Sequence, residues 1–238
     1  MPPFVPVKIP TGGGHDSRAR ALQLWAESEE AKTAGLAAEV RIDRPLENGS
    51  RFYRFGTWLY NTIQKICPRL HKVYFPFLEN ANLHRRSTRI LGAKRFRQVV
   101  SAFAPDVVLS VHAHLNHAYC DLARQAMPER PPAFVIYCGE LADGIGFSRH
   151  WINPDAELFA GPLDETCEAA RSRGMPEEKL FRAGFLLRPP FFRKLSSEQQ
   201  ANFIRNKWNL DPSRPLLVLG TGANGVNRHL KAVSPYWS

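Results

Sequence analysis

A histidine directly follows three glycines near the start of the chain, in the run TGGGH at residues 11–15. The run lies between a predicted strand and a predicted helix. Glycines at such a turn let backbone N–H groups approach a ligand, and the start of a helix favours negative charge. The same helix end disfavours an imidazolium, so we expect His15 to be neutral and able to act as a general base. The alternative interpretation is a tight turn whose histidine only caps the helix.

Three more histidines follow a buried-type strand, in the run SVHAHLNH at residues 110–117. Ligands of open α/β sheets bind outside the carboxyl ends of the strands, which is where His112 and His114 should lie. Three histidines in six residues could ligate a metal. However, no nearby carboxylate or cysteine completes a recognisable ligand set. Contact with a substrate and ordinary loop histidines are the two interpretations that remain.

Aromatic and basic residues are interleaved between residues 51 and 77, beginning with Arg51, Tyr53, Arg54 and Trp58. Aromatic rings and cations together suit a membrane interface, where the cations attract anionic lipid. The same composition could stack single-stranded bases. A third possibility is an ordinary core helix with a basic outer face.

A second glycine-rich turn, GTGANG at residues 220–225, follows a predicted strand at 215–220. It matches the GxGxxG pattern of dinucleotide-binding folds, but no acidic residue lies about twenty positions further on. The match therefore indicates a turn that approaches a phosphate, through Gly220, Gly222 and Asn224, rather than a nicotinamide site.

Composition sets the limits for these candidates. The 238 residues allow one large domain, or one domain and part of a second. Hydrophobic residues make up 44% and charged residues 23%, as in globular proteins. Thirty-two Lys and Arg against 22 Asp and Glu give a net charge of +10, which favours an anionic partner: nucleic acid, anionic lipid or a phosphorylated substrate.

Targeting and redox signals are few. No apolar run approaches the ~18 residues of a spanning helix. The N-terminus lacks the pattern of a secretory signal, so we expect a cytoplasmic protein. The four cysteines form no CxxC pair and are expected to be reduced and mostly buried.

Short apolar runs alternate with helical periodicity, which predicts an α/β fold with a mostly parallel sheet. Strands are predicted at 4–9, 39–42, 106–112, 133–138, 156–160, 179–183 and 215–220. Helices are predicted from a cap at Asp16 or Ser17, and at 56–66, 83–103, 162–173 and 196–208, the last capped by Ser196. Pro6 and Pro10 remove ladder donors, so the first strand is expected to be compromised as a central strand.

Five segments occur in an order that resembles a known family. They are TGGGH, PDVVLSVHAH at 105–114, HWINPDAELF at 150–159, GMPEEKLFRAGFLLRPPF at 174–191 and LLVLGTGANG at 216–225. Together they resemble the glycosyltransferases that include monogalactosyldiacylglycerol synthases and bacterial processive diacylglycerol glucosyltransferases. The resemblance runs from about residue 8 to 230. One departure is Cys138-Gly139-Glu140, where the family usually has Thr-Asp.

The resemblance implies a GT-B arrangement, in which two Rossmann-like domains face each other across a cleft. Residues 1–208 would form the acceptor-binding domain, 209–214 the linker, and 215–238 the truncated start of the donor-binding domain. The implied activity is transfer of a hexose from a UDP-sugar to diacylglycerol or a related lipid. Because the donor domain would be missing, the chain alone is not expected to transfer sugar at a useful rate.

The same resemblance suggests roles for the candidate residues. His15 would be the catalytic base. Acceptor and membrane binding would fall to Gly13, Gly14, Arg51, Tyr53, Arg54, Trp58, His112 and His114. Donor binding would fall to Gly220, Gly222 and Asn224. The expected partners are a lipid acceptor, an anionic membrane surface on the cytoplasmic face and a nucleotide-sugar donor, with no nucleic acid, no metal and no cofactor besides the UDP-sugar co-substrate. The alternative function is a non-catalytic, basic and aromatic lipid-binding module.

Overall fold

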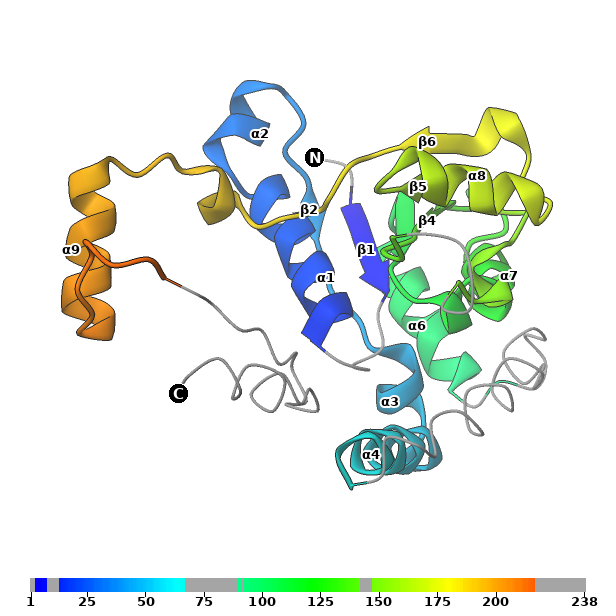
Figure 1. Ribbon diagram of the computed structural model, residues 1–238. Coiled ribbons are helices and arrows are strands. Elements are labelled where there is room, and N and C mark those ends of the chain that lie inside the picture. The colour runs from blue at the N-terminus through cyan, green and yellow to red at the C-terminus, as the bar shows by residue number, and fades with distance from the viewer. Residues whose placement is uncertain (1–2, 8–12, 67–89, 91, 142–146, 217–238) are drawn as a thin grey trace.

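The computed structural model describes residues 3–7, 13–66, 90, 92–141 and 147–216 (Figure 1). Its centre is a six-stranded sheet in the order β2-β1-β3-β4-β5-β6, and every neighbouring pair is parallel. The strands are β1 (Pro3–Val7), β2 (Glu39–Val40), β3 (Val107–Ser110), β4 (Ala133–Tyr137), β5 (Leu158–Gly161) and β6 (Leu180–Arg182). The predicted α/β fold with a parallel, Rossmann-like sheet flanked by helices is therefore confirmed.

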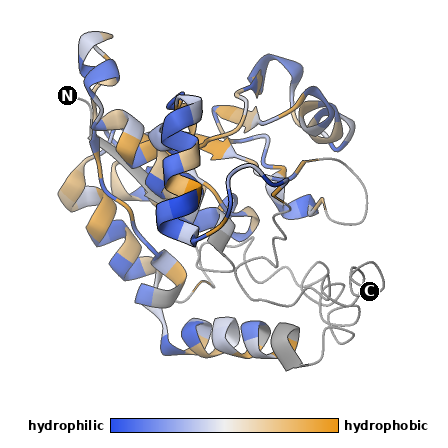
Figure 2. Ribbon diagram, turned by 60° about the vertical axis from the view of Figure 1, so that its left-hand side comes forward, coloured by the Kyte–Doolittle hydropathy of each residue, from blue (hydrophilic) through white to orange (hydrophobic). Residues whose placement is uncertain are grey.

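Helices connect the strands, as a parallel sheet requires. The α-helices are α1 (Gly13–Ala26), α2 (Glu29–Thr33), α3 (Pro45–Gly49), α4 (Arg51–Ile66), α6 (Ala93–Phe103), α7 (Ala118–Ala126), α8 (Asp164–Ser172) and α9 (Ser197–Trp208). Short 3₁₀ turns are η4 (Ala113–Leu115), η5 (Arg149–Trp151), η6 (Glu177–Lys179) and η7 (Pro189–Phe192). α4 lies at one end of the molecule, and hydrophobic and hydrophilic residues are interleaved along it (Figure 2).

Alternate residues of the strands face two separate cores. Phe134 and Ile136 of β4 pack with Phe96 of α6, Leu122 of α7 and Ala169 of α8 on one face. The other face is covered by α1 and the segment after β6. The residues of this second core are Ala19, Leu109, Val111, Tyr137 and Ala160, with Leu22 and Leu186 packed against them. β3, β4 and β5 thus contribute buried residues to both faces, which explains their nearly continuous apolar sequences.

The expectation that prolines would compromise the first strand is wrong. β1 lies inside the sheet, between β2 and β3. β2 pairs only with Pro3 and Phe4, whereas Pro6 is in register with Leu109 of β3. The stretch of β1 around Pro6 is therefore paired on one side only, where a missing N–H is tolerated as it is on an edge strand.

Two predicted helix starts are also wrong. α1 begins at Gly13, so Asp16 and Ser17 lie inside its first turns and neither is the cap. α4 begins at Arg51, five residues before the predicted start at residue 56. The hydroxyl of Ser50 accepts a hydrogen bond from the Phe52 N–H at 3.2 Å, which stabilises this earlier start.

Within the described residues, the helix predicted at 83–103 begins only at Ala93, as α6. Gly92 has φ of 89°, outside the helical region. A Cβ at Gly92 would lie 2.6 Å from the Cα of Gly49, so the close approach of α3 also requires a glycine there. Residues 83–89 lie outside the described residues. α7 was not among the predicted helices, and its buried face includes the small residues Ala118, Cys120 and Ala123.

Most other predictions agree with the structure. The strands predicted at 106–112, 133–138, 156–160 and 179–183 are β3 to β6, and Ser196 caps α9 in a complete capping box. The described cysteines are free thiols, buried at Cys120 and Cys138 and partly buried at Cys167.

The predicted strand at 215–220 lies mostly outside the described residues. No helix of the described part is long and apolar enough to cross a membrane.

Candidate functional site

The strand order places a topological switch point between β1 and β3. The chain leaves β1 through α1 to reach β2 on one side, and later enters β3 on the other side. At such a point the two connections diverge and leave a crevice at the carboxyl ends of the strands. His15 follows β1 and His112 follows β3, so both predicted histidines lie at this crevice.

The His15 ring is held by the chain that leaves β3. Its Nδ1 lies 2.6 Å from the Val111 carbonyl oxygen. A carbonyl oxygen can only accept a hydrogen bond, so Nδ1 must carry the hydrogen. In the neutral ring this leaves Nε2 with a free lone pair, which is the arrangement of a general base.

His15 is neutral at physiological pH. Its pKa is lowered from 6.5 to about 4, mainly by burial and next by the charge of Arg18, while the Val111 hydrogen bond and Asp16 act in the opposite direction. The neutral state that the sequence predicts is thus present. Its main physical cause is burial, rather than the helix end alone.

Four histidine rings form a row that begins at His15. The centroids of His15 and His112 are 4.5 Å apart, those of His112 and His114 are 5.2 Å apart, and His114 lies 5.3 Å from His150. The structure therefore brings His15, His112 and His114 together. His150, which is fully buried, was not among the predicted site residues. No group of three or more His, Cys, Asp or Glu side chains in the described ranges is arranged to hold a metal ion.

Asn116 fixes the histidine loop to the turn that carries His150. Its Oδ1 accepts from the Ser110 hydroxyl at 2.5 Å, and its Nδ2 donates to the carbonyls of His150 and Trp151 at 3.2 and 3.3 Å. The Asn153 amide donates to the Asn116 carbonyl at 2.6 Å. All of these polar groups are buried and bonded to one another, so the loop after β3 has a defined position.

The described glycines of the first motif open α1. Gly13 is its first residue and Gly14 is exposed beside it. A Cβ at Gly14 would meet only the Arg18 guanidinium, at 3.9 Å, so packing does not require a glycine there. Gly220, Gly222 and Asn224 lie outside the described residues.

The aromatic and basic helix presents an exposed face. Phe52, Phe55 and Trp58 are 69%, 56% and 59% exposed, and the rings of Phe55 and Trp58 are 5.6 Å apart. Arg51 and Arg54 are exposed on the same helix. Tyr53, which we expected to bind acceptor or membrane, instead packs against the main core.

A salt bridge connects the residue before α3 to the first turn of α1, and α3 in turn leads into α4. Arg44, the residue before α3, donates to the Asp16 carboxylate at 2.9 Å, and Asp16 is next to His15. Ser50 then joins α3 directly to α4. Figure 1 shows both helices beyond the end of the sheet toward which β1 points. The exposed aromatic face is therefore positioned at the end of the molecule that carries His15.

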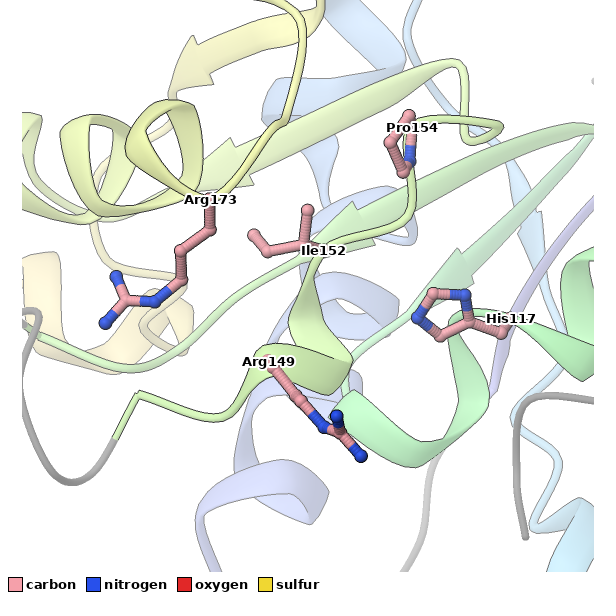
Figure 3. Close-up of a pocket in the computed structure, with 5 residues that line it drawn as sticks. All are labelled: His117, Arg149, Ile152, Pro154 and Arg173. Carbon is pink, nitrogen blue, oxygen red and sulfur yellow. The ribbon is translucent and has the colours of Figure 1, made fainter. Parts of the chain in front are cut away.

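A separate cavity of about 470 Å³ is lined by His117, Arg149, Ile152, Pro154 and Arg173 (Figure 3). The two guanidinium groups extend to different sides of Ile152 and do not converge on one point (Figure 3). Of the histidine run after β3, only His117 lines this cavity.

Comparison with known proteins gives weak but consistent similarities. No protein-family model matches the chain. A probable monogalactosyldiacylglycerol synthase 3 of Oryza sativa subsp. japonica is 22% identical over 225 residues, covering 91% of this chain and 41% of the relative. Monogalactosyldiacylglycerol synthase 1 of Arabidopsis thaliana is 21% identical over 224 residues, covering 91% and 39%.

Among solved structures, the apo form of the lipopolysaccharide outer core galactosyltransferase WaaB matches 76% of this chain and 44% of its own, with 11% identity and a TM-score of 0.39. The chain spans about two fifths of the length of the curated relatives it matches. The sequence similarity supports a relationship to glycosyltransferases.

Proposed function

We propose that this chain is the acceptor-binding domain of a glycolipid glycosyltransferase of the GT-B type, which transfers a hexose from a UDP-sugar to diacylglycerol or a related lipid. The observation that carries the proposal is the neutral His15 at the crevice between β1 and β3, whose Nδ1 donates to the Val111 carbonyl and whose Nε2 therefore carries the lone pair of the ring. The sequence similarity to monogalactosyldiacylglycerol synthases supports the choice of reaction.

In the proposed reaction the acceptor hydroxyl approaches Nε2 of His15. Nε2 takes the hydroxyl proton while the oxygen forms a bond to the anomeric carbon, and the bond to UDP breaks with its electron pair leaving on the diphosphate. The resulting imidazolium keeps its Nδ1–H bond to the Val111 carbonyl, which favours the charged ring at that moment. A positioned base typically contributes about 10²–10⁴-fold in rate.

The exposed face of α4 is the proposed membrane contact. Arg51 and Arg54 would lie at the anionic headgroups, while Phe52, Phe55 and Trp58 would enter the interface. Each cation near such a surface contributes about 1 kcal/mol. The proposal places the protein at the cytoplasmic face of a membrane, with the lipid acceptor delivered to His15 from the same end of the sheet.

The proposed domain organisation has three parts. Residues 1–208 bind the acceptor, 209–214 form a linker, and 215–238 begin a donor-binding domain, with Gly220, Gly222 and Asn224 near the UDP-sugar. His112 and His114 would contact the acceptor beside His15, and Gly13 and Gly14 would let it approach the backbone. The UDP-sugar is a co-substrate, and the proposal includes no metal or other cofactor.

Sugar transfer tests the proposal directly. The chain, alone and fused to the C-terminal region of the Arabidopsis thaliana relative, is incubated with radiolabelled UDP-galactose or UDP-glucose and vesicles that contain diacylglycerol. Labelled glycolipid formed by the fusion, and not by the C-terminal region alone, is the expected result. Vesicle binding without transfer by either form would favour the second candidate, a non-catalytic lipid-binding module, which the exposed aromatic face of α4 also fits.

A further inference from the structure

Arg18 reaches from α1 to the end of β4, two strands away from β1. It lies three residues after His15 and therefore on the same side of α1. Its Nη2 donates to the Gly139 carbonyl at 2.8 Å, and the side chain is half-buried. The first turns of α1 are thus attached to two strand ends: to β3 through His15 and Val111, and to β4 through Arg18 and Gly139.

Gly139 is a glycine because the guanidinium lies directly against it. A Cβ at Gly139 would be 1.8 Å from Cζ of Arg18 and 2.2 and 2.3 Å from Nη1 and Nε. Gly139 has no positive φ, so its backbone conformation is open to any residue. Any side chain at this position would displace the guanidinium, which makes Arg18 and Gly139 a single structural unit.

The charge of Arg18 acts on the titratable groups around it. On α1, Asp16 faces His15 with the opposite effect, but its carboxylate is paired with Arg44 at 2.9 Å. The neighbouring His112 ring lies 4.5 Å from the His15 ring. Burial raises the pKa of Glu140, and Arg18 lowers it. The nearby Tyr137 and Cys138 also have raised pKa values because they are buried, with Arg18 opposing the rise in both.

We infer that Arg18, seated on Gly139, is a positioning residue that fixes the first turns of α1 against β4 and so holds the His15 ring at the Val111 carbonyl, with a guanidinium one helical turn away. This inference rests on the function proposed above only in taking His15 as the base. The consequence is that His15 keeps its Nε2 lone pair across the neutral and mildly acidic range. Without the seated guanidinium, the ring would be protonated at a higher pH.

A titration of His15 followed by NMR on the intact chain measures this effect without any reaction. In the wild type we expect His15 to titrate with a pKa of about 4. Arg18→Met removes the charge, and Gly139→Ala displaces it, so both should move the pKa of His15 upward toward 6.5. Arg18→Lys keeps a positive charge but not the planar guanidinium. Its His15 pKa should therefore lie between those of the wild type and of Arg18→Met.

Two matched controls come from the same chain. Arg20→Met removes an exposed neighbouring arginine of α1 that donates to the Gln23 side chain, and Gly56→Ala adds a Cβ with no described atom of another segment within 4 Å. Both should leave the His15 titration unchanged. If Gly139→Ala fails to fold, the His15 pKa can still be measured in Arg18→Met, because that change introduces no clash. An unchanged His15 pKa in folded Arg18→Met would overturn the inference.

Transfer activity separates this inference from the proposed function. In the fused enzyme, Arg18→Met should move the acid limb of the pH profile of kcat to higher pH, while Arg20→Met should not. If the enzyme transfers no sugar but the His15 pKa rises in Arg18→Met, the proposed function fails and the role of Arg18 in positioning His15 stands. If the fused enzyme transfers sugar, but Arg18→Met has the same pH profile of kcat and the same His15 pKa as the wild type, the inference alone fails.

Discussion

The partly buried His15 ring should make the folded state less stable in mild acid. Its pKa is about 4 in the folded chain and 6.5 as the unperturbed value, so between these pH values the unfolded chain binds more protons than the folded one. Stability from this group is therefore complete above pH 6.5 and falls as the pH drops to about 4. The difference in pKa corresponds to about 3 kcal/mol.

Urea unfolding of the wild type and His15→Asn at neutral and mildly acidic pH measures this effect. The Asn side chain can still donate to the Val111 carbonyl but has no group that titrates. Burial raises the pKa values of Glu140 and Asp121, and these two groups stabilise the folded state as the pH falls, opposite to His15. The contribution of His15 is therefore the difference in unfolding free energy between wild type and His15→Asn at each pH. Parallel pH dependences in wild type and variant would contradict a buried, neutral His15.

Asn116 should be one of the most sensitive polar residues of the chain. Asn116→Ala removes one of the two acceptors of the Ser110 hydroxyl and the amide that donates to two buried carbonyl groups. We expect the free energy of unfolding to fall by about 2–4 kcal/mol, because unsatisfied buried polar groups are costly. Denaturant unfolding is the measurement, and Asn206→Ala on the exposed surface of α9 is the control. A loss no larger than that of the control would show that the loop is held by other contacts.

At the scale of elements, α4 should determine binding to anionic membranes. The double change Phe55→Ser and Trp58→Ser removes two exposed rings, and Arg51→Ser with Arg54→Ser removes two cations. Each pair should weaken sedimentation with vesicles of phosphatidylcholine and phosphatidylglycerol, and higher salt should weaken wild-type binding.

The control for α4 is Phe203→Ser with Trp208→Ser, two exposed aromatic residues on α9. This variant should sediment with anionic vesicles like the wild type. Equal binding of the wild type to anionic vesicles and to phosphatidylcholine alone would rule out an electrostatic contribution of α4.

The sequence predicts the strands of this fold better than the ends of its helices. β3 to β5 are short, mostly buried and rich in apolar residues, so their local pattern matches their environment. The starts of α4 and α6 depend instead on single contacts, the Ser50 hydroxyl and the approach of Gly92 to Gly49. Such contacts between segments leave no periodic pattern.

The candidate site is predictable only in part for the same reason. His15 and His112 can be placed together because parallel strands end at one edge of a sheet. Arg18 and Gly139 are 121 residues apart, and neither local sequence pattern predicts their contact. The sequence does give one signal, since Gly139 lies where the resembling family has Thr-Asp. Asn116 and His150 likewise become part of the site only through tertiary contacts.

At the scale of the whole molecule, the segment after β6 leaves an unusual apolar surface. Phe185, Phe191, Phe203 and Trp208 are 50%, 66%, 48% and 47% exposed, and α9 has no buried residue. Exposed aromatic residues gathered in one segment are typical of surfaces that contact another domain. This agrees with the proposal that an acceptor domain here faces a donor domain.

That proposal predicts that a donor domain covers part of this surface. In the fusion with the C-terminal region of the Arabidopsis thaliana relative, a Cys introduced at Phe203 or Phe191 should be labelled more slowly by a thiol reagent than in the chain alone. A Cys introduced at Leu36, which is 74% exposed on another element, should be labelled equally in both forms. Equal labelling at all three positions would place the second domain elsewhere.

The turnover of His15→Asn in the fused enzyme tests the central claim most directly. The Asn amide can preserve the bond to Val111 but offers no basic nitrogen to the acceptor hydroxyl. We predict a kcat lower by about 100-fold or more, with KM for the lipid acceptor and the unfolding transition at neutral pH close to those of the wild type. A His15→Asn enzyme that transfers sugar at the wild-type rate would contradict the assignment of His15 as the base.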